Sequence, residues 1–306
     1  MLKDKKAVFS SLGLLLCAVV WGSSFAVIKN SMDILKPLQL STLRYAIATI
    51  AMVPFYYKKI KTINRKIIID SVIAGFILFL GNTLQVVGTS MTSASNSAFL
   101  TSVYVVLVPL MIWAVKRVFP GAKTIAAAVM AFVGIGLLSF GEAGGINVGD
   151  LIVFGCGVVY AVQILVLAKY NMRYDVGLFT VLQLAVTAVF SAISVPFFEG
   201  PIQSGIFSGE ILFSVLYLGV VCSALTMLLY NIGLKYTPSS FASLIMSLES
   251  VFGAVFAAIL LGEKLNVQAK IGCVVVFAAI VLSQVSFKKA AVSGGDTVPK
   301  TADKSE

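Results

Sequence analysis

The sequence predicts an all-α polytopic membrane protein with ten transmembrane helices, arranged as two inverted five-helix repeats. Of its 306 residues, 59% are hydrophobic and 12% are charged, whereas soluble domains average about 45–50% and about 25%. The mean hydropathy is +1.00. Apolar runs of the length needed to cross a hydrocarbon core, roughly 20 residues, recur along almost the whole chain. These observations leave no room for a large soluble domain.

Each predicted helix is an apolar run bounded by polar or turn-forming residues. The predicted spans are 10–28, 38–56, 67–87, 95–115, 123–140, 150–168, 177–197, 210–233, 240–261 and 268–286. Residues 1–9 are predicted to form a cytoplasmic N-terminus. Residues 288–306 are polar and rich in small side chains, which predicts a disordered cytoplasmic tail.

The positive residues predict the orientation of the helices. Basic clusters fall at 58–66, 116–123 and 169–173, all in loops on the same side as the termini. The loops of the opposite side hold Lys29, Lys36, Lys264 and Lys270. Cytoplasmic loops carry the excess of lysine and arginine, so both termini are predicted to be cytoplasmic, in a multi-pass protein of the cell membrane. The net charge of +10 therefore reflects topology, and a nucleic-acid partner is not expected.

The residue types present limit the chemistry. The chain has no histidine, which removes imidazole bases and most transition-metal sites. Its four cysteines, Cys17, Cys156, Cys222 and Cys273, lie in apolar runs without a paired spacing and are interpreted as small buried side chains. No metal and no cofactor are predicted.

An internal repeat relates the two halves of the chain. At an offset of 145 residues, Gly88 aligns with Gly233 and Thr92 with Thr237. Each half, 10–141 and 150–287, holds five predicted spans. Because five is odd, the second half must enter the membrane from the opposite side. Inverted repeats of this kind are found in many secondary transporters, whose substrate site lies near the midplane between the halves.

Several motifs in order resemble one known family. They are WGSSF at Trp21–Phe25, the Arg44-Tyr45 pair, the repeated glycine–threonine turn, and LESVFGAVFAAILLGEKL at Leu248–Leu265. Over residues 10–287 the chain resembles the EamA branch of the drug/metabolite transporter superfamily. The first half departs from the pattern, with Arg117-Val118 where the second half has Gly262-Glu263. The resemblance implies export or exchange of small metabolites and amino acids through a central cavity.

Glu249 is the first candidate for a functional residue, because it lies inside the apolar run Ser243–Leu261. A carboxylate near the middle of a span costs about 2.5–3.5 kcal/mol on insertion scales, so it is expected to face a cavity or a partner. It is predicted either to attract a cationic group of the substrate or to carry a proton in exchange for substrate. The competing interpretation is a structural carboxylate bonded to a neighbouring helix.

Other polar and aromatic residues form stripes at helical spacing and correspond across the repeat. Their amides, hydroxyls and rings could replace the water of a crossing solute. The predicted substrate-binding residues are Trp21, Ser24, Asn82, Gln85, Thr101, Tyr104, Tyr160, Gln163, Tyr230 and Glu249. For the hydroxyl and amide residues the alternative is hydrogen bonding between helices, and for the aromatic residues it is ordinary packing. Arg44 is interpreted mainly as a structural charge that reaches toward the interface, with contact to an anionic substrate group as the alternative.

The predicted function is secondary transport, by alternating access, of small organic metabolites such as amino acids, amines or drug-like compounds, with export favoured. The alternative within transport is uptake of a metabolite or sugar phosphate, which would require several inward basic residues. The alternative from another class is a lipid-modifying membrane enzyme, although the short loops show no catalytic cluster; the chain is not expected to be an enzyme. Substrate identity, proton coupling and oligomeric state stay open.

Overall fold

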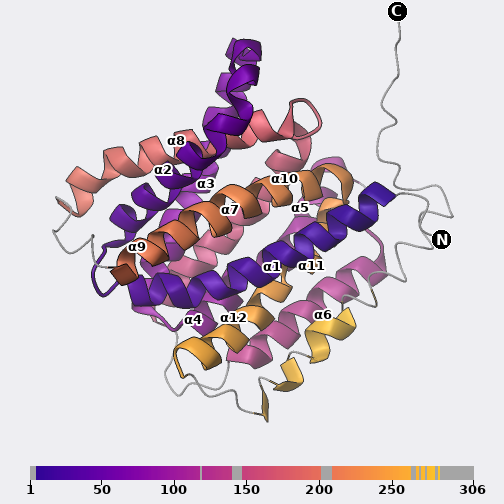
Figure 1. Cartoon of the computed structure of the whole chain (residues 1–306). Coiled ribbons are helices and arrows are strands. Elements are labelled where there is room, and N and C mark those ends of the chain that lie inside the picture. Colours follow the sequence, from indigo (N-terminus) through magenta and orange to yellow (C-terminus); the bar gives the residue numbers. More distant parts are fainter. Residues whose placement is uncertain are drawn as a thin grey trace, which may run out of the picture.

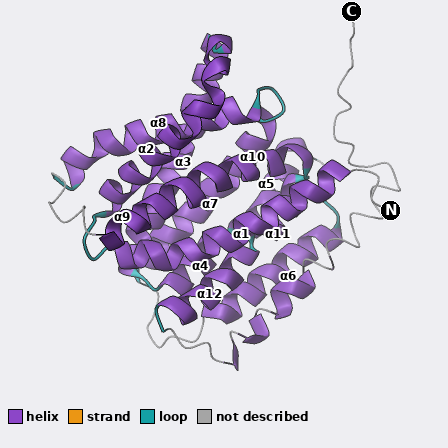
Figure 2. Ribbon diagram, viewed as in Figure 1, coloured by secondary structure: helices purple, strands orange, loops and turns teal. Residues whose placement is uncertain are grey.

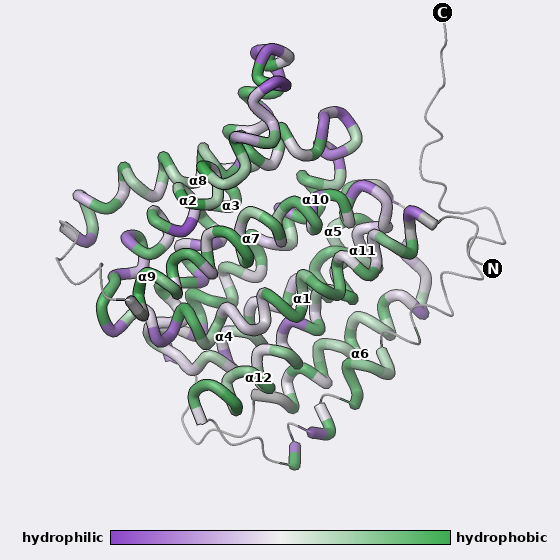
Figure 3. Tube along the Cα trace, in the orientation of Figure 1, coloured by the Kyte–Doolittle hydropathy of each residue, from purple (hydrophilic) through white to green (hydrophobic). Residues whose placement is uncertain are grey.

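A computed structural model describes residues 5–117, 119–139, 147–200, 209–262, 267–268, 270–272, 274–279 and 282. In these residues every regular element is a helix, and no strand is present (Figure 2). Hydrophobic residues make up much of the length of the helices, and many hydrophilic residues lie at helix ends and connections (Figure 3). The expected tail 288–306, the end of the expected span 268–286, and Cys273 lie outside the described residues.

The first half of the chain contains seven helical elements. They are α1 (Lys5–Ser31), α2 (Pro37–Tyr56), the 3₁₀ helix η1 (Tyr57–Thr62), α3 (Arg65–Met91), α4 (Ala94–Thr101), α5 (Tyr104–Lys116) and α6 (Ala122–Ser139). The caps fit the local sequence. Asn64 accepts hydrogen bonds from the first amides of α3, and Ser93 accepts one from Asn96 N in α4.

The second half contains a similar series of helices. Its elements are α7 (Val148–Tyr170), α8 (Val176–Phe198), α9 (Gly209–Leu216), the π-helix η3 (Tyr217–Leu225), α10 (Thr226–Tyr236), α11 (Ser239–Met246) and α12 (Leu248–Leu260). Asn147 and Asp150 form a capping box at the start of α7, and Asp175 caps α8.

Eight helical stretches of the described chain are long and apolar enough to cross a membrane. Two shorter apolar helices, Ala122–Leu137 and Lys270–Ala279, follow the first four and the second four. The protein is therefore a multi-pass membrane protein. The predicted spans 38–56 and 177–197 agree with α2 and α8 to within one residue at each end.

Three predicted spans are not uniform helices. The span 95–115 is interrupted at Ser102–Val103, 240–261 is interrupted at Ser247, and 210–233 passes through the π-helix η3. At the first two interruptions the backbone tightens, because Val105 N donates to Ser102 O (3.0 Å) and Ser250 N donates to Ser247 O (3.2 Å). Hydrophobic periodicity alone does not reveal such changes of winding.

The two halves of the chain pack against each other rather than forming separate bundles. Helix α3 contacts α7 and α8, and α2 packs on α8. Figure 1 shows α1 lying between α10 and α12, both from the second half, and it contacts both. One continuous apolar core contains buried residues from both halves.

A polar network ties three helices together at one end of the bundle. Lys29 Nζ, on the last turn of α1, donates to Thr89 O (3.0 Å) and Thr92 O (2.8 Å) at the end of α3. Thr92 Oγ1 donates to Asp150 Oδ1 (2.6 Å) in α7. A cation at a helix C-terminus and an acid at an N-terminus both match the helix dipole. Lys29 therefore joins the end of α1 to the end of α3.

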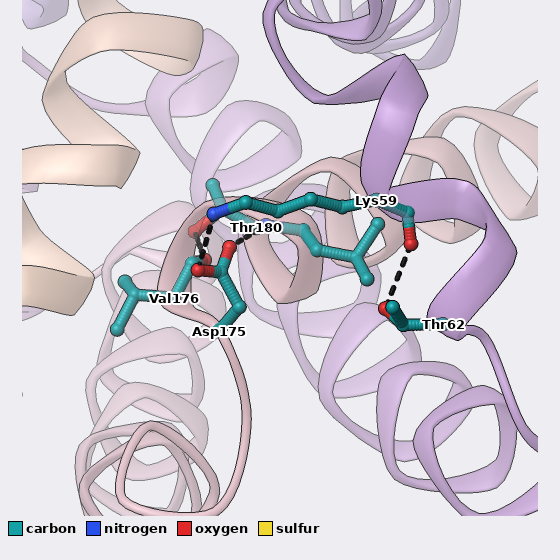
Figure 4. A network of polar contacts seen from close by, with 6 residues as sticks. Lys59, Thr62, Asp175, Val176 and Thr180 are labelled. Carbon is teal, nitrogen blue, oxygen red and sulfur yellow. Dashed lines mark hydrogen bonds and ion pairs between the residues drawn. The ribbon is translucent and has the colours of Figure 1, made fainter.

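Lys59 and Asp175 form an ion pair outside the core, drawn in Figure 4, with 2.6 Å between Nζ and Oδ2. Asp175 Oδ1 also accepts from Leu178 N (3.0 Å), which caps α8. Partial burial alone would raise the pKa of Asp175. The bonds from Lys59 and Leu178 and the charge of Lys59 outweigh burial and hold this pKa below its ordinary value of 3.8.

This pair predicts a pH dependence of stability. Because the folded-state pKa of Asp175 is depressed, its contribution is complete above the ordinary value and is lost as pH falls through the folded-state pKa. Asp175→Asn should remove this acid-dependent part and keep the cap, whereas Asp175→Ala should also lose the cap, about 0.5–2 kcal/mol. Thermal unfolding of purified protein between neutral pH and about pH 3 measures both. Identical acid profiles for wild type and Asp175→Asn would contradict the assignment.

Candidate functional site

A cavity lies between the helices of the two halves. About 630 Å³ of empty space lies in it, counting the open solvent at its mouth. Eight of the ten predicted site residues line it: Trp21, Ser24, Gln85, Tyr104, Tyr160, Gln163, Tyr230 and Glu249. The rest of the wall consists of Phe25, Arg44, Tyr45, Leu78, Ile164, Cys222, Ser223, Met227 and Met246.

Trp21 is fixed in the wall by the π-helix. In an α-helix the amide of Thr226 would bond the carbonyl of Cys222, but here it donates to Val221 O and Ser223 O. Trp21 Nε1 donates to Cys222 O at 2.8 Å. The indole also packs against the ring of Tyr230, with centroids 5.0 Å apart and planes at 59°. Sequence reasoning identified both rings but not the altered winding that holds Trp21.

Glu249 and Tyr104, both predicted as substrate-binding residues, contact each other directly. Tyr104 Oη donates to Glu249 Oε1 at 2.9 Å, and the two residues are 145 apart in the chain. Tyr104 is the first residue of α5 and Glu249 lies in the first turn of α12, so each follows an interruption in its span. The partial positive charge of a helix N-terminus favours an acid at this position. Glu249 is 4% exposed and forms no ion pair with any described lysine or arginine.

Tyr160 enters the cavity because its neighbour has no side chain. A Cβ on Gly81 would lie 2.5 Å from Tyr160 Cε1, so only glycine leaves room for this ring beside α3. Tyr160 Oη donates to Gln85 Oε1 at 3.3 Å. Both residues also line the cavity, so this bond joins α3 and α7 in the wall itself.

Gln163 and Ser24 differ in their hydrogen bonding. Ser24 Oγ donates to Trp21 O in its own helix, at 2.7 Å. Gln163 is 3% exposed, and its Nε2 has no hydrogen-bond partner among the described residues. An unpaired buried amide is costly, about 1–3 kcal/mol. A bound polar group would satisfy it.

Arg44 lies in the cavity wall and does not reach toward the interface as expected. It is 7% exposed, its Nε donates to Ser223 Oγ at 2.5 Å, and its guanidinium lies 5.4 Å from the ring centroid of Tyr45. Ser223 belongs to η3, so the π-helix orients this charge as well as Trp21. The sequence analysis had considered contact between Arg44 and an anionic substrate group as the alternative role of this charge.

Asn82 and Thr101 do not line the cavity. Asn82 joins α2 and α3, because its Oδ1 accepts from Tyr45 Oη (3.0 Å) and its Nδ2 donates to Ser41 Oγ (2.7 Å). Thr101 ends α4 and is 1% exposed, and its hydroxyl has no partner among the described residues. For Asn82 the structure therefore shows the alternative considered above, hydrogen bonding between helices.

Within the described part of the chain, no three His, Cys, Asp or Glu residues come close enough together to hold a metal ion. Cys17, Cys156 and Cys222 are free and buried, as their apolar surroundings predicted.

A multi-pass helical protein whose polar and aromatic residues converge on one cavity has the architecture of a membrane transporter. A model of the EamA-like transporter family matches residues 8–140 and again 147–284. The chain belongs to this family, as the motifs of the first, second and ninth helices indicated. It is a membrane transporter.

The relatives agree with this membership. An uncharacterized transporter of Archaeoglobus fulgidus is 30% identical over 277 residues, 90% of this chain and 86% of the relative. A second from the same organism is 25% identical over 284 residues, 88% and 95% of the two chains. One from Haemophilus influenzae is 28% identical over 150 residues, 46% of this chain and 85% of its own. The chain also shares its fold with a protein of known crystal structure. The TM-score is 0.76 at 15% identity, and the match covers 92% of this chain and 98% of the other.

Proposed function

We propose that this protein is a secondary transporter that exports small organic metabolites by alternating access through the cavity between its halves. The observation that carries the proposal is the cavity wall itself, which takes polar and aromatic side chains from both halves. A solute that leaves water there meets amide, hydroxyl and charged groups able to replace its hydration. The substrate class is a small molecule such as an amino acid, an amine or a drug-like compound.

The proposed mechanism needs ten spans in two inverted repeats. Helix ends support the repeat: α3 and α10 end at Met91 and Tyr236, and α4 and α11 begin at Ala94 and Ser239. Each of these pairs is separated by the same 145 residues as Tyr104 and Glu249. The two short apolar helices would complete five spans in each half. With an odd number of spans per half, the copies take opposite orientations and can rock against each other.

The proposed topology follows the distribution of charge. Both termini, 1–9 and 288–306, lie in the cytoplasm of a protein in the cell membrane, and the repeats occupy 10–141 and 150–287. The basic loops support this orientation. The two family matches, 8–140 and 147–284, are compatible with these repeat boundaries.

Two other functions are less well supported by the cavity. Uptake of a sugar phosphate would require several basic groups facing the ligand. Arg44 lines the cavity, but Lys29 is bonded to the end of α3. A lipid-modifying enzyme would require a catalytic cluster at the membrane interface, whereas the acid and the aromatic residues singled out here converge inside the bundle.

Glu249 is the proposed coupling residue. As an anion it attracts a cationic group of the substrate, and as an acid that exchanges its proton for substrate it links flux to a pH gradient. The two roles differ in their observable, because only the second makes substrate flux move protons.

Purified protein in liposomes tests the proposal. A mixed metabolite extract is loaded inside, and efflux is followed by mass spectrometry with and without a pH gradient. We expect efflux of particular small solutes above that of empty liposomes. Turnover of lipid without any solute flux would instead support the enzyme and reject transport.

The aromatic wall predicts a loss of affinity on truncation. Trp21→Ala and Tyr160→Ala should each weaken substrate binding about 2- to 12-fold, because each ring removes roughly 0.5–1.5 kcal/mol of contact. Calorimetric titration of purified protein with a solute identified by the efflux experiment measures the effect. Trp113→Ala is the matched control, because Trp113 is 46% exposed and packs against Phe119 away from the cavity. Unchanged affinity in both cavity variants would make these rings packing residues.

A further inference from the structure

The 3₁₀ helix η1 has three faces of different chemical character. It ends the span Pro37–Thr62 and is followed by the span Arg65–Met91, so it lies at a surface of the membrane. A 3₁₀ helix has three residues per turn, and residues three apart therefore share a face. The attached face is Lys59 and Thr62, the basic face is Lys58 and Lys61, and the apolar face is Tyr57 and Ile60.

The attached face is bound to the second half of the chain. Lys59 Nζ lies 2.6 Å from Asp175 Oδ2, and Thr62 Oγ1 donates to Lys59 O at 2.7 Å (Figure 4). Directly before η1, the ring of Tyr56 fills the space beside Gly177, where a Cβ would lie 1.9 Å from Tyr56 Cε1. These contacts hold one side of η1 against the start of α8.

The basic and apolar faces are exposed. Tyr57 and Ile60 are 56% and 49% exposed, although both side chains are large and mostly apolar. Lys58 and Lys61 are exposed as well, and neither forms an ion pair with a described residue. In Figure 1 the end of α2 and the residues after it project away from the other helices at the top of the view. η1 therefore presents an apolar face and a basic face side by side, outside the helix bundle.

The charged residues around η1 are basic. No acid occurs in the sequence from Val53 to Ile69, and Arg65 and Lys66, both exposed, open α3. Basic groups in a first turn oppose the positive end of the helix dipole, so a nearby anion stabilises them. The next acid along the chain, Asp70, already accepts a hydrogen bond from Tyr174 Oη at 2.7 Å. The described chain therefore supplies no counter-ion to the basic face or to the start of α3.

We propose that η1 binds anionic phospholipids of the membrane leaflet at its end of the bundle. The basic face, together with Arg65 and Lys66, holds the phosphate groups, and the apolar face lies among the upper parts of the acyl chains. A phospholipid fits both faces because it joins a charged phosphate to apolar chains, whereas a soluble anion fits only the basic face. This lipid site is independent of which solute the central cavity carries.

Lipid binding is tested on the purified full chain in a neutral detergent. Thermal unfolding is followed as dioctanoyl phosphatidylglycerol, dioctanoyl phosphatidylcholine or inorganic phosphate is added, because a ligand of the folded state raises the melting temperature. We expect phosphatidylglycerol to raise it by at least about 2 °C, and the other two, at equal concentration, to change it by less than about 1 °C. Raising the salt concentration to about 0.5 M should remove most of the effect, because it screens the phosphate contacts.

The variant Lys58→Gln/Lys61→Gln tests the basic face. Each lysine near an anionic lipid surface contributes about fivefold in affinity, so this variant should bind phosphatidylglycerol about 25-fold more weakly. The affinity is taken from the lipid concentration that the melting-temperature shift requires. Arg117→Gln/Lys123→Gln is the matched control, because it removes the same charge from exposed positions in the connection between α5 and α6. The control should bind this lipid within about twofold of wild type.

The variant Tyr57→Ala/Ile60→Ala tests the apolar face. It keeps every charge and the pair of Lys59 with Asp175, and it should still weaken phosphatidylglycerol binding by at least about threefold. Unchanged binding would show that the lipid chains do not contact this face and would reduce the site to an anion site.

Three results would overturn the lipid site. They are stabilisation of wild type by phosphatidylcholine or inorganic phosphate as strong as that by phosphatidylglycerol, no stabilisation by any of them, and an equal loss of binding in the Arg117→Gln/Lys123→Gln control. A wild-type oligomer that dissociates when Lys58 and Lys61 are replaced would assign the surface to a second copy of the chain instead. Because no flux is measured, each of these results leaves the transport proposal standing.

Discussion

Glu249→Gln is expected to reduce substrate flux by at least about tenfold and to leave the protein folded. Glutamine has the shape of glutamate and can still accept the hydrogen bond from Tyr104 Oη. What is lost is the negative charge, and a hydrogen bond to a charged group is stronger than a neutral one by about 1 kcal/mol or more. Any exchange of a proton at this position is lost as well. Flux into proteoliposomes, measured with and without a pH gradient, shows both losses.

Two measurements accompany this variant. Thermal unfolding of the purified variant establishes that it folds, and Asp33→Asn, which removes an exposed acid from the loop after α1, gives the matched control. Flux and pH dependence equal to those of wild type would remove Glu249 from both binding and coupling. Lost flux with unchanged proton movement per solute would keep Glu249 as a ligand of the substrate and exclude coupling.

Gly22→Leu is expected to cause a large loss of stability. A Cβ at Gly22 would lie 2.6 Å from Phe252 Cβ, 2.9 Å from Gly253 N and 3.0 Å from the carbonyl oxygen of Glu249. Two of these three atoms are backbone, so α12 must move away from α1 to admit any side chain. Overpacking of this kind costs roughly 1–3 kcal/mol or more. The movement would also displace Glu249, so transport should fall with stability.

Gly13 provides the comparison for this change. It lies on the same helix, and a Cβ there would meet no atom within 4 Å. Gly13→Leu should therefore leave stability unchanged or raise it slightly, because leucine favours helix over glycine by about 0.8 kcal/mol. Thermal unfolding of the two variants side by side measures the difference. Equal melting temperatures would show that the close contact between α1 and α12 does not limit the packing.

Much of the fold follows from the sequence because the bilayer imposes its length on each apolar run. α2 and α8 begin and end where their polar neighbours predict. The wide turns of η3 escape such reasoning because its residues are as apolar as those of an ordinary span, and the interruption at Ser247 escapes it because hydropathy does not specify winding. Those local changes depend on which helices meet, which hydropathy does not record.

For the cavity, too, some features could be predicted from the sequence and others could not. Tyr104 and Glu249, 145 residues apart, are hydrogen-bonded to each other, and both were candidates from their sequence positions. Asn82 has the same helical spacing to Gln85 as the other candidates, yet its amide is used by Tyr45 and Ser41. Spacing defines a helix face but not the residue opposite it. Arg44 was assigned by its position in the span, although its burial depended on Ser223, far away in the sequence.

In the π-helix η3, a backbone carbonyl binds a side chain of another helix, Trp21 of α1. The Cys222 carbonyl accepts from Trp21 Nε1 while Thr226 N donates to Val221 O and Ser223 O instead. If this stretch were an ordinary α-helix, Thr226 N would also donate to the Cys222 carbonyl, and the carbonyl would shift relative to the indole. The same change of winding would turn the Ser223 hydroxyl, and Arg44 Nε would lose the hydrogen bond that orients its side chain. The winding of this one helix therefore sets the hydrogen bonds of two side chains, Trp21 and Arg44, that belong to other helices.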